Sequence, residues 1–214
     1  MKTMIAVPCL DQMDTAFVKS LVELKKPGDV IHRFISCSLV YKARNDLAYE
    51  ARTEDADFVL WLDSDMVFPK TTLEDMLCSI EGKDMLSGVC HMRRPPYKPV
   101  LYKKLRQGLT PEENESEEWP DYPKDKPFEI EGCGFGCVLV RGSVIKDMIF
   151  HFRDCFGPLP GYGEDLSFCI RARKLGYHIW CDPAIQIGHR AATVVTGQTF
   201  EAWRKTHPEG RAEE

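Results

Sequence analysis

The run Phe58-Val59-Leu60-Trp61-Leu62 has no polar break, and it limits more narrowly than any other segment how this chain can fold. A strand that is apolar on both faces must be covered on both, which is typical of the centre of a parallel sheet. The first half of the chain alternates such short apolar runs with helical patterns. This alternation predicts an α/β fold with a mostly parallel central sheet flanked by helices.

Periodicity and turn residues place the individual elements. We expect Thr71-Thr72-Leu73-Glu74 to form a capping box and Ser143 to cap a later helix. The alternating Gly132, Gly134 and Gly136 leave room for another group to approach the backbone closely. Expected strands cover residues 4–7, 30–36, 58–62, 85–92, 128–131, 178–181 and 184–188, and expected helices cover 14–26, 42–54, 71–81, 143–152 and 165–175.

Residues 93–128 break the alternation. They contain seven of the fourteen prolines and the acidic stretch 112–118, without apolar periodicity. We therefore expect a long loop outside the core that serves as a lid on the acceptor side of an active site. Residues 1–200 are expected to form one domain, followed by a polar tail at 201–214.

Charge and composition exclude some partners. The net charge of −5 offers no basic footprint, so nucleic acid or an anionic membrane is not expected as the main partner. No apolar run approaches the roughly 20 residues of a transmembrane helix. Because the first residues lack the pattern of a secretory signal, a cytoplasmic location is expected.

Nine scattered cysteines without a CxxC pair suggest reduced core residues rather than a disulfide framework. Cys133 and Cys137, with Cys90-His91, could approach a zinc ion, but ordinary packing is the preferred interpretation.

The acidic turn Asp63-Ser64-Asp65 follows the central apolar strand. In open α/β sheets, ligands bind outside the carboxyl ends of the strands. Two carboxylates one residue apart can share a hard divalent cation such as Mg²⁺ or Mn²⁺. A solvated acidic turn is the alternative.

Two later motifs carry further candidate groups. In Gly161-Tyr162-Gly163-Glu164-Asp165, a glycine loop delivers two carboxylates to the start of a helix, where one could act as a general base or both could simply cap the helix. His189, at the end of the last strand, could add an imidazole to a metal held by Asp65, or be structural.

Together, the strand ending in Asp63-Ser64-Asp65, the helix start Gly163-Glu164-Asp165 and the pair Gly188-His189 occur in an order that resembles a GT-A glycosyltransferase, most similar to the family 2-like inverting enzymes. The resemblance covers roughly residues 3–190. Supporting matches are Ile5-Ala6-Val7-Pro8, Ala43-Arg44-Asn45 and the glycine-rich segment 132–136. It implies a single-domain, Rossmann-like nucleotide-diphospho-sugar transferase fold.

The resemblance implies a donor site. Asp65 would ligate Mn²⁺ or Mg²⁺ directly, Asp63 would contact the ribose or the metal through water, and Ser64 would belong to the same donor-binding turn. His189 matches the family's late metal-ligand position. The donor would be a nucleoside diphosphate sugar, with a UDP-sugar favoured.

It also implies roles for residues around the donor. Asp165 would deprotonate the acceptor hydroxyl, with Glu164 beside the acceptor. Arg44 would bind the nucleotide or its phosphates, or else be an exposed helix arginine without a partner. Pro8 and Asp11 would lie near the base and ribose.

The expected function is therefore metal-dependent, inverting transfer of a sugar to a hydroxyl acceptor on a glycan, a lipid-linked group or a protein. Arg93 and Arg94 could contact phosphate or form a solvated loop entrance, and Trp119, Tyr122 and Tyr162 could stack on sugars or pack.

Two alternatives to this function stay open. The first alternative is a sugar nucleotidyltransferase, which is disfavoured because the glycine-rich, basic phosphate loop of those enzymes is missing near the first strand. The second alternative is a non-catalytic nucleotide-binding scaffold of the same fold.

Overall fold

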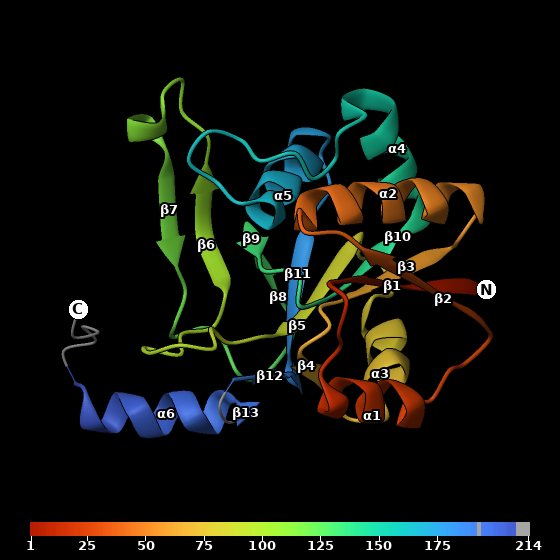
Figure 1. The fold of residues 1–214 in the computed structure, drawn as a ribbon. Coiled ribbons are helices and arrows are strands. Elements are labelled where there is room, and N and C mark those ends of the chain that lie inside the picture. Colours follow the sequence, from red (N-terminus) through yellow and green to blue (C-terminus); the bar gives the residue numbers. More distant parts are fainter. Residues whose placement is uncertain (192–193, 209–214) are drawn as a thin grey trace.

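The computed structural model describes residues 1–191 and 194–208. Its central sheet consists of β1 (Lys2–Cys9), β2 (Asp29–Ser36), β3 (Phe58–Leu62), β5 (Met85–Val89), β8 (Phe128–Ile130), β10 (Cys137–Arg141) and β11 (Ile179–Gln186). The order across the sheet is β2-β1-β3-β10-β5-β11-β8 (Figure 1). Strands β8 and β10 run antiparallel to their neighbours, and the others are parallel. The prediction of a mostly parallel sheet is confirmed.

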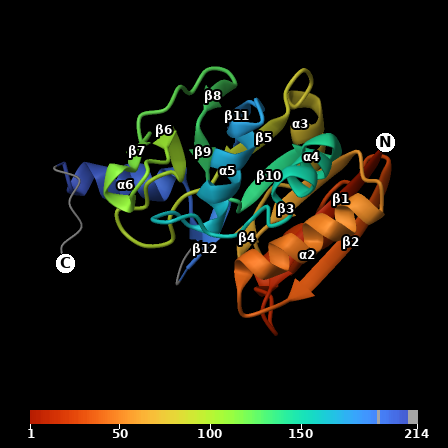
Figure 2. The same ribbon diagram turned by 90° about the horizontal axis from the view of Figure 1, so that it is seen from above.

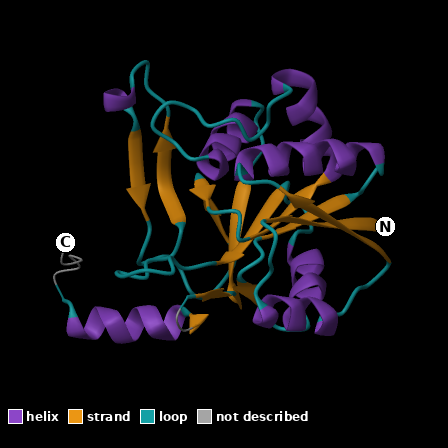
Figure 3. Cartoon of the chain, in the orientation of Figure 1, coloured by secondary structure: helices purple, strands orange, loops and turns teal. Residues whose placement is uncertain are grey.

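Helices cover both faces of this sheet (Figures 1 and 3). One face carries α2 (Val40–Thr53), α4 (Gly142–Phe152) and α5 (Glu164–Lys174), and the other carries α1 (Thr15–Glu23) and α3 (Thr72–Ser79). Seen from above, α2 runs along β1 and β2 (Figure 2). It buries Ala43, Leu47 and Ala51, which are spaced four residues apart and therefore lie on one side of the helix. Among the helices of the described residues, none has the length and apolar character required to cross a bilayer.

Strand β3 contributes side chains to two separate hydrophobic cores, as its apolar sequence predicted. Val59 and Trp61 pack in the core on the side of α2 and α4, whereas Leu60 and Leu62 pack in the core on the opposite face. All four side chains are fully buried. Alternate side chains of a strand point to opposite faces of the sheet. Because the run is apolar throughout, it contributes apolar side chains to the cores on both faces.

The two cysteines beside the alternating glycines lie in different strands, β9 for Cys133 and β10 for Cys137. Cys133 lies in the first core and Cys137 in the second, on opposite faces of the sheet. The pair therefore cannot share a metal ion, and both are packing residues.

The expectation that residues 93–128 form a structureless loop outside the core is wrong. Strands β6 (Leu101–Arg106) and β7 (Glu115–Glu118) form a hairpin closed by a short 3₁₀ helix, η1 (Pro111–Glu113), and β6 also pairs with β9 (Gly132–Cys133). The side chains of Leu101 and Leu105, both on β6, are buried in the core on the side of α2 and α4. The outer strand carries glutamates that pair with lysines across the hairpin, such as Lys104 with Glu115 at 2.7 Å. Cross-strand charge pairs support this sheet without an apolar alternation.

The carboxyl-terminal part is also more regular than expected. β12 (Gly188–Arg190) pairs with β13 (Val194–Val195) and with β4 (Met66–Val67). Helix α6 (Gly197–Thr206) continues through position 201, where the polar tail was expected to begin, because Phe200 is buried and anchors it. Residues 209–214 of that tail lie outside the described residues. In place of the two short strands expected at 178–181 and 184–188, the single strand β11 runs to Gln186, with an irregularity between Cys181 and Gln186, and Gly188 begins β12.

Both expected helix caps are wrong. Thr71 precedes α3 in a helical conformation and makes no capping hydrogen bond through its side chain. Helix α4 begins at Gly142, before Ser143. The amide of Gly142 donates to the carbonyl of Asp57 at 2.7 Å, and a β-carbon there would lie 1.8 Å from the carbonyl oxygen of Ala56. Only glycine lets the two backbones approach this closely.

Candidate active site

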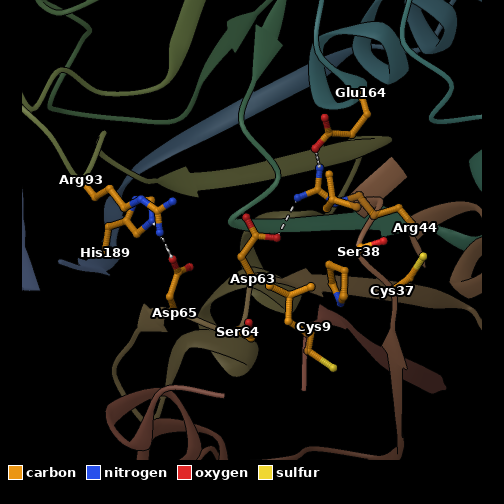
Figure 4. Close-up of a pocket in the computed structure, with 13 residues that line it drawn as sticks. Cys9, Cys37, Ser38, Arg44, Asp63, Ser64, Asp65, Arg93, Glu164 and His189 are labelled. Carbon is orange, nitrogen blue, oxygen red and sulfur yellow. Dashed lines mark hydrogen bonds and ion pairs between the residues drawn. The ribbon is translucent and has the colours of Figure 1, made fainter. Parts of the chain in front are cut away.

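The acidic turn Asp63-Ser64-Asp65 borders a cavity of about 390 Å³ at the carboxyl ends of β1, β2 and β3. This is the edge at which α/β sheets bind ligands. Figure 4 shows the side chains that surround it. The lining residues are Pro8, Cys9, Leu10, Cys37, Ser38, Val40, Arg44, Asp63, Ser64, Asp65, Arg93, Glu164 and His189.

Arg44, on α2, bridges two carboxylates of the cavity (Figure 4). Its Nη2 lies 2.7 Å from Oδ1 of Asp63, and its Nη1 lies 2.8 Å from Oε1 of Glu164. The side chain is only 3% exposed, and its guanidinium carbon lies 5.5 Å from the ring centre of Phe135. The alternative of an exposed helix arginine without a partner is wrong. Paired on both sides and packed on an aromatic ring, Arg44 holds the two acidic side chains in fixed positions.

Asp65 faces two basic side chains across the cavity mouth (Figure 4). Nε2 of His189 lies 3.2 Å from Oδ2 of Asp65, and Nη1 of Arg93 lies 3.1 Å from the same oxygen. The pairing of β12 with β4 sets His189 opposite Met66, and the amide of Arg190 donates to the carbonyl of Asp65 at 2.8 Å. The small sheet thus brings residues 65 and 189 together.

The orientation of His189 is fixed from behind. Its Nδ1 lies 2.8 Å from the carbonyl oxygen of His91. A carbonyl oxygen only accepts hydrogen bonds, so Nδ1 carries a proton, and the lone pair of the neutral ring is on Nε2. Such backbone contacts are the usual support of a metal-binding histidine. Nε2 is therefore the nitrogen that faces Asp65 and is available to a metal.

Burial and charge act against each other in this site. Burial raises the pKa of Asp63, and the charge of Arg44 only partly offsets the rise. Burial also favours a higher pKa for Asp65, but the hydrogen bond and charge of His189 outweigh it and lower that pKa. For His189, burial favours a lower pKa, but the hydrogen bonds to Asp65 and His91 outweigh it and raise that pKa.

Asp165 follows Glu164 in the first turn of α5 but does not line the cavity itself. Its Oδ1 accepts a hydrogen bond from the amide of Leu166 at 2.7 Å, and its Oδ2 faces Gly134, 3.7 Å from the position of a β-carbon there. Burial raises the pKa of Asp165 to about 6, with Arg44 opposing the rise and Glu164 adding to it. Such a carboxylate is deprotonated at neutral pH and has a basicity suited to general-base work.

The donor set suits a metal that also binds phosphate. Within residues 1–191 and 194–208, no group of three or more His, Cys, Asp or Glu side chains is placed to hold a metal ion, and Asp63 is turned towards Arg44. Asp65 and His189 would supply one carboxylate oxygen and one imidazole nitrogen. Mg²⁺ and Mn²⁺ accept few protein ligands when water and phosphate oxygens complete the shell. The two residues therefore fit a metal–nucleotide complex.

The structure brings most of the predicted donor-site residues to one cavity. Pro8 and Ser64 line it, but Asp11 lies beyond its lining and interacts with the hydroxyl of Ser36 at 3.4 Å. Sequence reasoning missed several lining residues at or just after the ends of β1 and β2: Cys9, Leu10, Cys37, Ser38 and Val40. The rule that ligands bind at the carboxyl ends of parallel strands could have found them.

The aromatic residues of the 93–128 region and the glycine loop make packing contacts. Tyr122 is buried and stacks with Phe128 at 5.8 Å, and Trp119 meets the same ring edge-on at 5.1 Å. The hydroxyl of Tyr162 donates to the carbonyl of Arg106 at 2.7 Å, which ties the glycine loop to the β6–β7 hairpin.

The alternating glycines admit side chains of the chain itself. A β-carbon at Gly132 would lie 2.7 Å from Leu105, one at Gly134 would lie 3.0 Å from Val100, and one at Gly136 would lie 3.0 Å from Met66. Gly136 therefore lies against Met66, the residue after Asp65, and a β-carbon at Gly134 would lie 3.7 Å from Oδ2 of Asp165.

Comparison of this fold with solved structures identifies its class. A197 from STIV matches with a TM-score of 0.65 at 16% identity, over 89% of this chain and 86% of that one. GalNAc-T7, solved with UDP, GalNAc and Mn²⁺, matches with a TM-score of 0.58 at 10% identity, over 88% of this chain and 43% of that one. The chain has the fold of the GT-A glycosyltransferases, as its motif order led us to expect.

In sequence, the chain is similar to the mannan polymerase complex subunit MNN9 of Candida albicans, with 25% identity over 186 residues. The match covers 71% of this chain and 49% of that protein, so the chain spans about half the length of this relative. No protein-family model matches the chain.

Proposed function

We propose that this protein is a metal-dependent, inverting glycosyltransferase that moves a sugar from a nucleoside diphosphate sugar to a hydroxyl group. One observation carries the proposal: Asp65 and the oriented Nε2 of His189 face each other in a cavity that also holds the Arg44-bridged pair Asp63 and Glu164. The fold and the sequence relative support it, since one structural neighbour was solved with UDP and Mn²⁺ and the relative is named as a mannan polymerase subunit.

The donor would bind with its diphosphate towards Asp65 and His189. These two residues would hold Mn²⁺ or Mg²⁺, and Asp63 would contact the metal through water or the ribose. The chemistry that such a metal supplies when bound is neutralisation of charge on the departing diphosphate. A UDP-sugar is the donor favoured by the sequence resemblance, and the name of the relative adds a mannose donor to the candidates.

The acceptor hydroxyl would approach from the side of Asp165. Asp165 would take the proton as the hydroxyl oxygen bonds to the anomeric carbon, and the bond from that carbon to the diphosphate oxygen would break on the opposite side. This single displacement inverts the anomeric configuration. Glu164, fixed by Arg44, would shape the space beside the acceptor, which is a hydroxyl of a glycan, a lipid-linked group or a protein.

Release of nucleoside diphosphate from sugar nucleotides tests the proposal. A panel of UDP-hexoses and GDP-mannose is incubated with the protein in Mn²⁺ or in EDTA, and free UDP or GDP is measured. We expect slow, metal-dependent hydrolysis of at least one donor by the wild type and none by Asp65→Ala. Asp46→Ala, which removes an exposed carboxylate from α2, is the matched control. Inertness towards the whole panel in Mn²⁺ would contradict the proposal, and nucleotide binding without release would favour the non-catalytic scaffold.

A further inference from the structure

Arg93 contacts the oxygen of Asp65 that a metal ion held between Asp65 and His189 would need. It follows β5 in the chain, and its Nη1 lies 3.1 Å from Oδ2 of Asp65, the same oxygen that His189 approaches at 3.2 Å (Figure 4). A metal bound between Asp65 and His189 would compete with the guanidinium for this oxygen and would repel its charge. Arg93 would therefore have to leave this oxygen for a divalent cation to bind between Asp65 and His189.

The two arginines of the cavity differ in their freedom to move. Arg44 is 3% exposed and is held by two carboxylates, whereas Arg93 is 57% exposed and has one carboxylate partner. An exposed ion pair of this kind contributes little and separates readily. Arg93 can therefore change partners while Arg44 stays in place.

The cavity offers Arg93 no second carboxylate among its lining residues. Apart from Asp65, the acidic side chains that line the cavity are Asp63 and Glu164, and Arg44 holds both. The anion that would arrive with the metal is the diphosphate of the donor. A planar guanidinium matches phosphate oxygens well and forms charge-assisted hydrogen bonds with them.

We propose that Arg93 exchanges partners during donor loading: it pairs with Asp65 in the empty cavity and binds the diphosphate of the metal–nucleotide complex once the metal has taken Asp65. This inference rests on the proposed function of the cavity as a nucleotide-sugar site. It gives one residue two effects of opposite sign, since Arg93 weakens the binding of the metal alone and strengthens the binding of metal with nucleotide.

The first half is tested with Mn²⁺ alone, by following the signal of the free ion by electron paramagnetic resonance during titration of the full chain. Arg93→Ala should bind Mn²⁺ about two- to five-fold more tightly than the wild type, the range expected for an exposed ion pair. Arg94→Ala is the matched control. Arg94 is the exposed neighbour and makes no side-chain ion pair with the described residues, so the affinity should be unchanged.

The second half is tested by calorimetric titration of UDP and of GDP at saturating Mn²⁺. Arg93→Ala should bind whichever nucleotide the wild type binds about ten-fold more weakly, the usual effect of losing a charge-assisted hydrogen bond, and Arg94→Ala should match the wild type.

The outcomes are distinct. Unchanged Mn²⁺ affinity in Arg93→Ala, unchanged nucleotide affinity, or equal effects of Arg94→Ala would each overturn the exchange. If the wild type binds Mn²⁺ but neither nucleotide, the proposed function fails, and the binding of diphosphate by Arg93 fails with it. The Mn²⁺ titration would still decide whether Arg93 and the metal compete for Asp65.

Discussion

The guanidinium of Arg44 and the carboxylate of Glu164 lie 2.8 Å apart although 120 residues separate them in the chain. The same guanidinium also binds Asp63, so one buried cation joins helix α2, the end of β3 and the start of α5. Asp63 and Glu164, which the proposal places on the donor side and beside the acceptor, are thereby held in one arrangement.

Replacing Arg44 with methionine should destabilise the fold. Methionine keeps much of the packing but leaves two carboxylates facing each other without the cation, and breaking such a buried pair costs about 3 kcal/mol. The free energy of unfolding in urea measures this loss. Arg52→Met, at the exposed end of the same helix, should change it by no more than about 0.5 kcal/mol. A loss below about 1 kcal/mol for Arg44→Met would show that the bridge does not hold the site together.

Asp165→Asn should abolish transfer without weakening the donor site. The substitution removes the basic oxygen while keeping size and hydrogen bonding, so turnover should fall by about 100-fold or more. The affinities for Mn²⁺ and nucleotide should stay within about two-fold of the wild type, because Asp165 lies outside the cavity lining. Full turnover in this variant would remove Asp165 as the base.

The rate should also depend on pH through Asp165. Since burial raises its pKa to about 6 and the base acts when deprotonated, kcat/KM should rise between pH 5 and 7 and then level off. A profile without an acid limb near pH 6 would argue against this assignment.

Metal affinity should fall as the pH is lowered, because a proton on Nε2 of His189 excludes the metal. The contacts with Asp65 and His91 raise the pKa of His189, so the fall should begin at a higher pH than a free imidazole, with its pKa of about 6.5, would give. Below that pKa, the Mn²⁺ dissociation constant should rise about ten-fold per pH unit. His189→Gln should bind weakly and lose this dependence. Equal dependence in both proteins would assign the proton to another group.

Two glycine substitutions should affect metal binding and sugar transfer differently. A β-carbon at Gly136 would push on Met66, next to Asp65, so Gly136→Ala should weaken Mn²⁺ binding and destabilise the fold by about 1–3 kcal/mol. A β-carbon at Gly134 would push on Val100 and approach Asp165, so Gly134→Ala should reduce transfer more than Mn²⁺ binding. Mn²⁺ titration and donor turnover of the two variants distinguish these effects, and identical defects would contradict them.

The sheet was predictable because its evidence is local. The apolar run 58–62 coincides with β3. A strand that is buried on both faces of a sheet needs apolar residues at every position, so such a run predicts a central strand. The hairpin β6–β7 was not predictable from periodicity. Its outer strand is stabilised by charges on a partner strand, such as Lys104 for Glu115, which only the folded chain brings together.

The candidate site divides in the same way. Asp63 and Asp65 could be placed because they follow a predictable strand directly, and the rule for ligand position then applies. The bridge from Arg44 to Glu164 and the contact of Arg93 with Asp65 depend on how α2, α5 and the segment after β5 pack around the sheet. No spacing within a single segment encodes such contacts, and they emerge only from tertiary structure.

A metal-dependent nucleotide site built on Asp65 can be tested by calorimetric titration of UDP, GDP and CDP into the wild type and Asp65→Ala, each in Mn²⁺ and again in EDTA. We expect the wild type to bind one nucleotide in Mn²⁺, with little or no binding in EDTA, and Asp65→Ala to bind none in either. Failure of the wild type to bind any nucleotide in Mn²⁺, or equal binding by Asp65→Ala, would contradict it.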